Sequence, residues 1–193
     1  MNRTALFAGS FDPYTNGHHA IVRKAATLFD QVVVLIGVNV RKQRCFDADA
    51  MRRAIGKALE ADGLSNVSVV IWDGLVADYC AEHAIHWYVR GIRNHQDYSY
   101  EESFAQVNRL INPDLETIYL RADDSVLSSS MIRELLSFHK DVSAYVPESV
   151  ARECGIDGGT TLSKVTNWNL ARRTPHPSRL RRSTDGGLPA RPR

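Results

Sequence analysis

The residues best suited to chemistry lie near the N-terminus, in the run GSFDPYTNGH at residues 9–18. Gly9 lets the backbone approach a ligand closely, because glycine has no side chain. Gly17 precedes an expected helix, whose first N–H groups offer hydrogen bonds and positive potential to a phosphate. Ser10 and His18 add polar side chains to the same run. These residue types predict a phosphate-handling loop.

Two other clusters supply positive charge and hydroxyl groups. Lys42 lies within the run RKQR, and Arg90 and Arg93 bound the run RGIR. The serines at 128–130 precede a second expected helix and offer hydroxyls at its start. The sequence has neither GxxxxGK[ST] nor GxGxxG, which excludes a P-loop enzyme and argues against a dinucleotide-dependent dehydrogenase.

Each feature also has a purely structural interpretation, and taken singly that interpretation is favoured. His18 could be a surface or capping residue, and the serines at 128–130 only an N-cap. Lys42 could belong to a solvated charge run, and Arg90 and Arg93 could make surface ion pairs. Their recurrence after successive predicted strands favours function over coincidence.

The pattern of apolar residues predicts the elements that position these side chains. Short strand-like runs alternate with helical spacing, which predicts an α/β fold: a Rossmann-like open parallel sheet of about five strands with helices on both faces. The predicted strands are residues 5–8, 32–38, 67–72, 86–89 and 117–120. The predicted helices are residues 18–29, 47–61, 76–85, 98–111 and 129–138, with another beginning near Pro147.

Ligands of an open parallel sheet bind outside the carboxyl ends of its strands. The glycine, serine, histidine, lysine and arginine residues described above all follow predicted strands, and Asp73-Gly74 follows the third. We therefore expect five loops to meet at one edge of the sheet.

Composition limits the class of protein. The chain has 193 residues, 44% of them hydrophobic, which suits a globular domain with a real core. The longest apolar run, residues 32–38, is too short to cross a bilayer. The N-terminal region lacks a signal-peptide pattern, so a cytoplasmic location is expected. Three scattered cysteines argue against a disulfide framework or a zinc site.

Charge separates the last segment from the rest. Residues 155–193 carry eight of the 24 basic and two of the 22 acidic residues, which leaves a mildly acidic body with 16 and 20. This basic tail is rich in Pro, Gly and Arg and is predicted to be disordered. A solvated extension is favoured over contact with nucleic acid, so no nucleic-acid partner is expected.

Several separated motifs resemble one family. Residues 9–18 resemble the first signature of the nucleotidyltransferases that carry an HxGH-type motif. Thr15 stands where that motif begins, a variant typical of phosphopantetheine adenylyltransferases. LSSSMIRE at 127–134 resembles the second signature. RGIR at 90–93, followed by DYSYE at 97–101, resembles a further stretch of the same family.

The resemblance covers residues 3 to about 153, so residues 1–154 are expected to form the nucleotidyltransferase domain. It implies transfer of the adenylyl group of ATP to 4′-phosphopantetheine, giving dephospho-CoA and pyrophosphate in coenzyme A biosynthesis. Mg²⁺ would assist, with no protein ligand assigned to it. The resemblance also implies a homo-oligomer, specifically a hexamer.

The same resemblance implies roles for particular residues. His18 would donate to the α-phosphate in the transition state, and Ser10 and Lys42 would orient the acceptor phosphate. Val76 and Arg90 would contact the phosphopantetheine side. The ATP site would be formed by Ser10, Phe11, His18, Gly91, Ile92, Arg93, Glu101, Ser128, Ser129 and Ser130.

This chain departs from the family pattern in two places. Ser10 replaces the commoner threonine and keeps the hydroxyl. The loop at residues 121–127 is shorter than usual and lacks an aromatic residue before the serines. Asp123 and Asp124 in that loop are interpreted as solvated rather than metal-binding, because loop aspartates are ordinarily exposed.

Two alternatives stay open. One is a nucleotidyltransferase of the same fold with another acceptor, such as a cytidylyltransferase or a nicotinamide mononucleotide adenylyltransferase. Thr15 and the three serines at 128–130 argue against it, since those enzymes usually have histidine and threonines there. The other is a catalytically weak nucleotide-binding relative, which only the altered loop at 121–127 supports.

Overall fold

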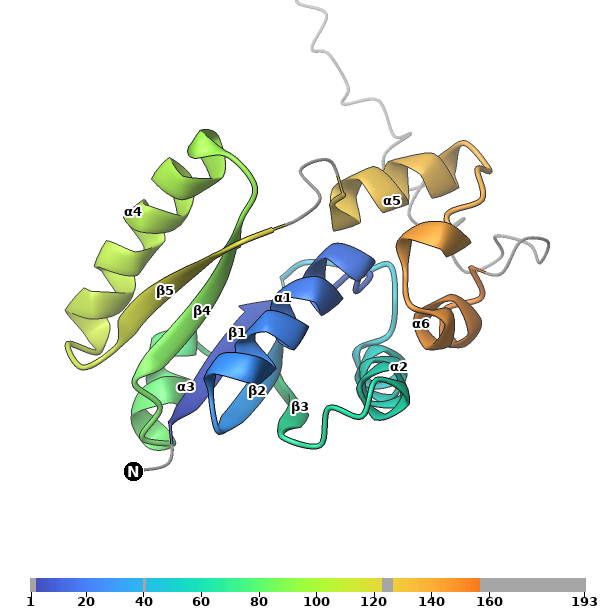
Figure 1. The fold of residues 1–193 in the computed structure, drawn as a ribbon. Helices are drawn as coiled ribbons and strands as arrows, with labels where there is room; N and C mark the ends of the chain where they lie inside the picture. The colour runs from blue at the N-terminus through green and yellow to red at the C-terminus, as the bar shows by residue number, and fades with distance from the viewer. Residues whose placement is uncertain (1–2, 40, 123–126, 157–193) are drawn as a thin grey trace, which may run out of the picture.

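The structure is a computed structural model, shown in Figure 1, that describes residues 3–39, 41–122 and 127–156. Asp123, Asp124 and all but the first two residues of the basic tail lie outside these ranges. Five strands form one sheet in the order β3-β2-β1-β4-β5, and every neighbouring pair is parallel. The strands are β1 (Thr4–Gly9), β2 (Gln31–Gly37), β3 (Val67–Trp72), β4 (Trp87–Ile92) and β5 (Glu116–Arg121). The predicted α/β fold is confirmed.

Helices follow the strands in alternation. They are α1 (Asn16–Leu28), α2 (Ala48–Ala61), α3 (Val76–Glu82), α4 (His95–Ile111), α5 (Ser129–Ser137) and α6 (Glu148–Glu153), with a 3-10 turn η1 (Ser143–Tyr145). None of the helices in the described part of the chain is long and apolar enough to span a membrane.

The two faces of the sheet bury separate cores because side chains alternate along each strand. Ala5 and Phe7 of β1 join the larger core, to which α1, α2, α5 and α6 contribute. Leu6 and Ala8 of the same strand join a smaller core on the face that α3 covers. The sheet is thus covered on both faces, as Figure 1 shows.

Helix α4 is held differently, since none of its residues is buried. It lies along β4 and β5 (Figure 1), where ion pairs and hydrogen bonds attach it to the sheet. Glu101 pairs with Arg90 of β4, and the Tyr119 hydroxyl of β5 donates to Glu102 Oε2 at 2.7 Å. Large apolar side chains stay exposed further along the helix, including Leu110, which is 85% exposed.

Three boundaries differ from the sequence prediction by three residues, and the other predicted boundaries differ by at most two. Helix α3 ends at Glu82 rather than 85, because Ala84 adopts a left-handed φ of 51° that a helix cannot continue through. Helix α4 begins at His95, because the Asn94 side chain accepts from the N–H of Asp97 and caps the helix. Strand β4 continues through Arg90, Gly91 and Ile92, because these residues pair with β5. Only Arg93 of that run therefore follows the strand.

Close packing of α1 on β4 sets a test of the fold. A Cβ added at Gly91 would lie 2.9 Å from Cγ1 of Ile21, which is 2% exposed and belongs to α1. Gly91→Ala should therefore lower the free energy of unfolding by about 1–3 kcal/mol. Gly56, inside α2, has nothing within 4 Å of an added Cβ. Gly56→Ala should raise the free energy of unfolding by about 0.5–1 kcal/mol.

Urea unfolding followed by circular dichroism measures both changes. Equal stability of the Gly91→Ala variant and the unsubstituted protein would contradict the packing of α1 against β4.

Candidate active site

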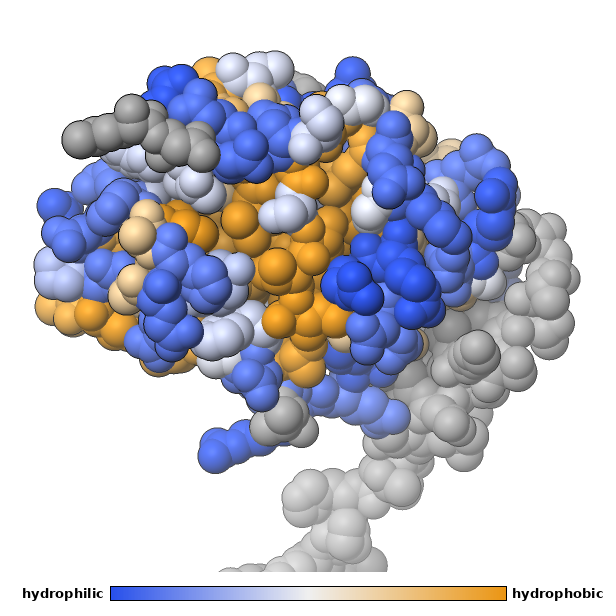
Figure 2. All heavy atoms as spheres, turned by 90° about the horizontal axis from the view of Figure 1, so that it is seen from below, coloured by the Kyte–Doolittle hydropathy of each residue, from blue (hydrophilic) through white to orange (hydrophobic). Residues whose placement is uncertain are grey.

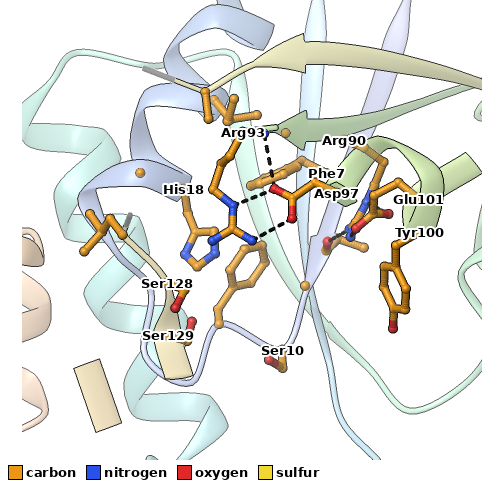
Figure 3. A pocket seen from close by; sticks show the side chains of 18 residues that line it. Phe7, Ser10, His18, Arg90, Arg93, Asp97, Tyr100, Glu101, Ser128 and Ser129 are labelled. Atoms are coloured by element: carbon orange, nitrogen blue, oxygen red, sulfur yellow. Dashed lines mark hydrogen bonds and ion pairs between the residues drawn. The ribbon is translucent and has the colours of Figure 1, made fainter. Parts of the chain in front are cut away.

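A pocket of about 430 Å³ opens at the carboxyl edge of the sheet, where β1 and β4 lie side by side. This is the point where the strand order reverses, because the chain winds outward from β1 to β3 and then crosses to β4. Ligands of doubly wound sheets bind at such a switch point. The β1–α1 loop, the end of β4, the first turns of α4 and the start of α5 line the pocket (Figure 3).

The structure brings most of the sequence-predicted site residues into this pocket. Those lining it are Ser10, Phe11, His18, Arg90, Gly91, Arg93, Glu101, Ser128 and Ser129. Lys42, Val76, Ile92 and Ser130 are not among its lining residues. Lys42 is exposed in the loop after β2, and Val76 packs against the smaller core.

The orientation of His18 follows from how α1 begins. Thr15 is the N-cap, and its Oγ1 accepts from the backbone N–H of His18 at 3.3 Å. In return, the backbone N–H of Thr15 donates to His18 Nδ1 at 3.0 Å. A backbone N–H can only donate, so Nδ1 is the acceptor and the ring proton of neutral His18 belongs on Nε2.

The surroundings of His18 keep its ring neutral. Burial is the largest cause, followed by the positive charges of Arg90 and Arg93, and together they lower the pKa of His18 to about 4. The ring packs against Phe11 at a centroid distance of 5.1 Å and Tyr14 at 5.6 Å. At neutral pH the pocket therefore receives an uncharged N–H donor.

A lowered histidine pKa also has a consequence for stability. Between the ordinary pKa of 6.5 and about 4, the unfolded chain binds a proton that folded His18 does not. His18 therefore makes the fold less stable as pH falls through that window.

Two arginines of the pocket are paired with carboxylates of α4. Arg90 donates through Nε to Glu101 Oε2 at 2.6 Å and through Nη2 to Glu101 Oε1, and through Nη1 to Ala8 O at 2.7 Å. Arg93 Nε donates to Asp97 Oδ2 at 2.7 Å. Hydrogen bonding from the Arg93 side chain holds the pKa of Asp97 below its ordinary value. Both ion pairs are dashed in Figure 3.

The starts of α1 and α5 both meet the pocket, through Gly17 and His18 of one and Ser128 and Ser129 of the other. Ser128 is the N-cap of α5, and its Oγ accepts from Met131 N at 3.2 Å. In Figure 3 the two serines lie beside His18. The first N–H groups of a helix have no acceptor within the helix, so two helix starts with serine hydroxyls at one form an environment suited to a polyphosphate.

Sequence reasoning missed the side-chain contacts that hold the backbone of the β1–α1 loop. Arg44 donates to Ser10 O at 2.8 Å, Arg133 donates to Asp12 O, and Ser129 Oγ donates to Pro13 O at 2.8 Å. No motif marked Arg44, which looked like one member of a solvated charge run. Every residue has a backbone carbonyl, so the type of the accepting residue does not predict such a contact. Only the fold reveals it.

Metal ligands are sparse in the described part of the chain. It contains no group of three or more His, Cys, Asp or Glu side chains that could hold a metal ion. The pocket carboxylates of Asp97 and Glu101 are engaged by arginines. A metal held chiefly by protein side chains therefore does not fit here, whereas Mg²⁺ carried on substrate phosphates needs few protein ligands.

Proteins with similar sequences include several named phosphopantetheine adenylyltransferase. The relative from Cytophaga hutchinsonii is 38% identical over 152 residues, which span 78% of this chain and 100% of the relative. One from Streptococcus agalactiae is 40% identical over 79% of this chain and 96% of its own length. One from Streptococcus pneumoniae is 43% identical over 79% of this chain and 94% of its own length.

Solved structures with a similar fold include proteins named as other adenylyltransferases. A Vibrio parahaemolyticus protein provisionally identified as a nicotinate-nucleotide adenylyltransferase superposes with a TM-score of 0.59 at 19% identity. That alignment covers 90% of this chain and 98% of the other. A bifunctional NMN adenylyltransferase/ADP ribose pyrophosphatase from Francisella tularensis gives 0.59 at 16% identity, over 76% of this chain and 45% of the other. Identities this low establish the shared fold alone.

The model of the cytidylyltransferase-like family matches residues 6–135. That range contains the strands and helix starts that build the pocket, from the β1–α1 loop to the first turns of α5. Together with relatives that align over almost their whole length, this match confirms the resemblance of the sequence motifs: the chain belongs to the phosphopantetheine adenylyltransferase family, within the cytidylyltransferase-like nucleotidyltransferases.

Proposed function

We propose that this protein transfers the adenylyl group of ATP to 4′-phosphopantetheine, giving dephospho-CoA and pyrophosphate in coenzyme A biosynthesis. The single observation that carries the proposal is a neutral His18 N–H donor set between two helix starts at the sheet's switch point. Family membership supplies the acceptor, because the curated relatives carry the name phosphopantetheine adenylyltransferase.

The reaction needs positioning more than proton transfer. An oxygen of the acceptor phosphate attacks the α-phosphorus of ATP, the bond from that phosphorus to the α,β-bridging oxygen breaks, and pyrophosphate leaves with the bonding electrons. The acceptor is already an anion at neutral pH, so no strong base is required. Catalysis then consists of aligning the two substrates and stabilising the charge that develops on the α-phosphate and the leaving group.

His18 suits the second of these tasks. Its Nδ1 accepts from the Thr15 N–H, and its pKa of about 4 means that the ring stays neutral and does not exchange its charge state near neutral pH. The Nε2–H can donate a hydrogen bond to the α-phosphate as negative charge builds there. We therefore assign His18 to transition-state stabilisation rather than to acid–base catalysis.

The remaining groups are proposed to hold the two substrates. The start of α5, with Ser128 and Ser129 in the pocket and Ser130 next along the helix, would hold the β- and γ-phosphates. Ser10 and Lys42 would orient the acceptor phosphate. Other ATP contacts are proposed for Phe11, Gly91, Ile92, Arg93 and Glu101, and contacts with the pantetheine side for Val76 and Arg90.

Mg²⁺ is proposed to enter with ATP. When bound, the ion would neutralise phosphate charge, as it does for nucleotide substrates generally. No ligand from the chain is assigned to it, and the roles given above to His18 and the helix starts do not depend on it.

Self-association is proposed on the basis of exposed apolar surface. Side chains exposed on α4 include Tyr100, Phe104, Val107 and Leu110. Seen from below the view of Figure 1, apolar side chains form a band across the middle of the surface (Figure 2). Large apolar patches of this kind mark interaction sites.

The hexamer and the cytoplasmic location expected from the sequence are kept as part of the proposed function.

The acceptor assignment is tested by supplying ATP and Mg²⁺ with one acceptor at a time. Pyrophosphate should be released with 4′-phosphopantetheine and not with nicotinamide mononucleotide, and mass spectrometry should detect dephospho-CoA. Release with nicotinamide mononucleotide alone would defeat the acceptor assignment and favour a sister enzyme of the same fold.

The role of His18 is tested by substitution. His18→Ala removes the Nε2–H donor and should lower kcat about 100- to 1,000-fold, the range for loss of one charge-stabilising donor. His86→Ala is the matched control, because His86 is exposed just before β4, at the amino edge of the sheet. Near-normal kcat in a folded His18→Ala protein would refute the mechanism.

A further inference from the structure

One side chain behind the pocket, Arg44, joins three segments of the backbone. Its Nη1 donates to Ser10 O at 2.8 Å and lies 3.5 Å from Gly37 O. Its Nη2 donates to Phe11 O at 3.4 Å, and its Nε donates to Phe46 O at 3.1 Å. The part-buried guanidinium thus links the β1–α1 loop to the end of β2 and to the segment that leads into α2.

The β1–α1 loop and the segment that leads into α2 are also joined by hydrogen bonds in which a side chain of the loop accepts from the backbone of that segment. The carboxylate of Asp12, a residue only 8% exposed, accepts from Cys45 N at 3.0 Å and Phe46 N at 2.9 Å. Arg133 of α5 donates to the Asp12 carbonyl from a third direction. Arg44 therefore forms one half of a reciprocal connection: its side chain holds the loop's carbonyls, while a side chain of the loop holds the amides that follow Arg44.

Holding these carbonyls also orients the amides of the loop. In a planar trans peptide the C=O of one residue and the N–H of the next point in opposite directions. The Ser10 carbonyl is directed at Arg44, so the Phe11 N–H points away from it. The Phe11 carbonyl is also directed at Arg44, so the Asp12 N–H does the same. Ser10 and Phe11 line the pocket and Asp12 does not, so the Phe11 N–H is the one available to an anion there.

The conformation of this loop needs such support. Phe11 has a φ of 43°, in the left-handed region that a bulky side chain rarely adopts. Strained residues of this kind persist only where surrounding contacts over-determine them. Phe11 is 1% exposed and packs edge-on to Tyr14, so its ring is held on one side and its carbonyl on the other.

We propose that Arg44 is a positioning residue of the active site, which turns the Ser10 and Phe11 carbonyls away from the pocket so that the Phe11 N–H faces a substrate phosphate. Arg44 acts through the backbone and does not touch the substrate. The proposal rests on the proposed function only in taking ATP as the phosphate-bearing ligand, and it does not depend on the identity of the acceptor.

The test compares three variants by isothermal titration calorimetry with Mg²⁺ and ATP and without acceptor. Arg44→Ala should weaken ATP binding about 10-fold or more, because charge-assisted hydrogen bonds to the loop are lost. Arg44→Lys keeps the charge but cannot reach several carbonyls at once, so it should recover only a small part of the affinity. Arg52→Ala, which removes a half-exposed arginine from α2, should stay within about twofold.

A second readout separates positioning from mere stability. In ¹⁵N-resolved NMR spectra, ATP should shift the Phe11 amide of the unsubstituted protein, and this shift should be lost in folded Arg44→Ala. Unchanged ATP affinity with the same Phe11 shift in Arg44→Ala would overturn the inference, as would full recovery in Arg44→Lys. ATP binding that depends on Arg44 in a protein inactive toward phosphopantetheine would support this inference and defeat only the acceptor assignment.

Discussion

Helix α1 begins with a reciprocal pair of hydrogen bonds between Thr15 and His18, and the chemistry of the pocket depends on that pair. A capping box normally uses a glutamate or glutamine at the third helical position to accept the N–H of the cap. Here an imidazole takes that place. One interaction therefore starts the helix, aims the ring into the pocket and decides which nitrogen carries the proton. Thr15 is a structural residue whose effect on chemistry passes through His18.

Electrostatics in the pocket follow from what surrounds this pair. Burial and, after it, the charges of Arg90 and Arg93 lower the pKa of His18, yet each arginine is itself balanced by a carboxylate of α4. A polyphosphate that enters the pocket therefore interacts mainly with N–H dipoles and hydroxyl groups, because the charges of these two arginines are already paired. Such preorganised dipoles need little rearrangement when charge develops, which is the condition under which they stabilise a transition state best. The polar bonds that fix α4 to the sheet thus also shape the site.

Much of this arrangement could be predicted from the sequence because it follows from regular patterns. Apolar runs alternating with helical spacing define a parallel sheet, and a parallel sheet brings the loops at its carboxyl edge together. His18, Arg93 and Ser128 meet in the structure for that reason. The sequence also allowed His18 to be a capping residue, and the structure makes it the partner of the Thr15 N-cap in a capping box that lines the pocket.

Other parts depend on three-dimensional contacts that no local pattern encodes. Strand β4 runs through Arg90 and Gly91 because β5 pairs with them, although neither residue is typical of a strand. The pairing of Arg90 with Glu101 needs α4 to lie along β4, and the contacts of Arg44 end on carbonyls that any residue could supply. Such interactions become visible only when the chain has folded.

The central claim is that His18 meets its substrate as a neutral ring protonated on Nε2. Imidazole ¹⁵N chemical shifts of the selectively labelled protein, recorded from pH 8 down to pH 4, measure this directly. The structure predicts a neutral ring with the proton on Nε2 down to pH 5, and a titration midpoint at the lowered pKa of about 4. A midpoint near 6.5, or a neutral ring protonated on Nδ1, would contradict the account.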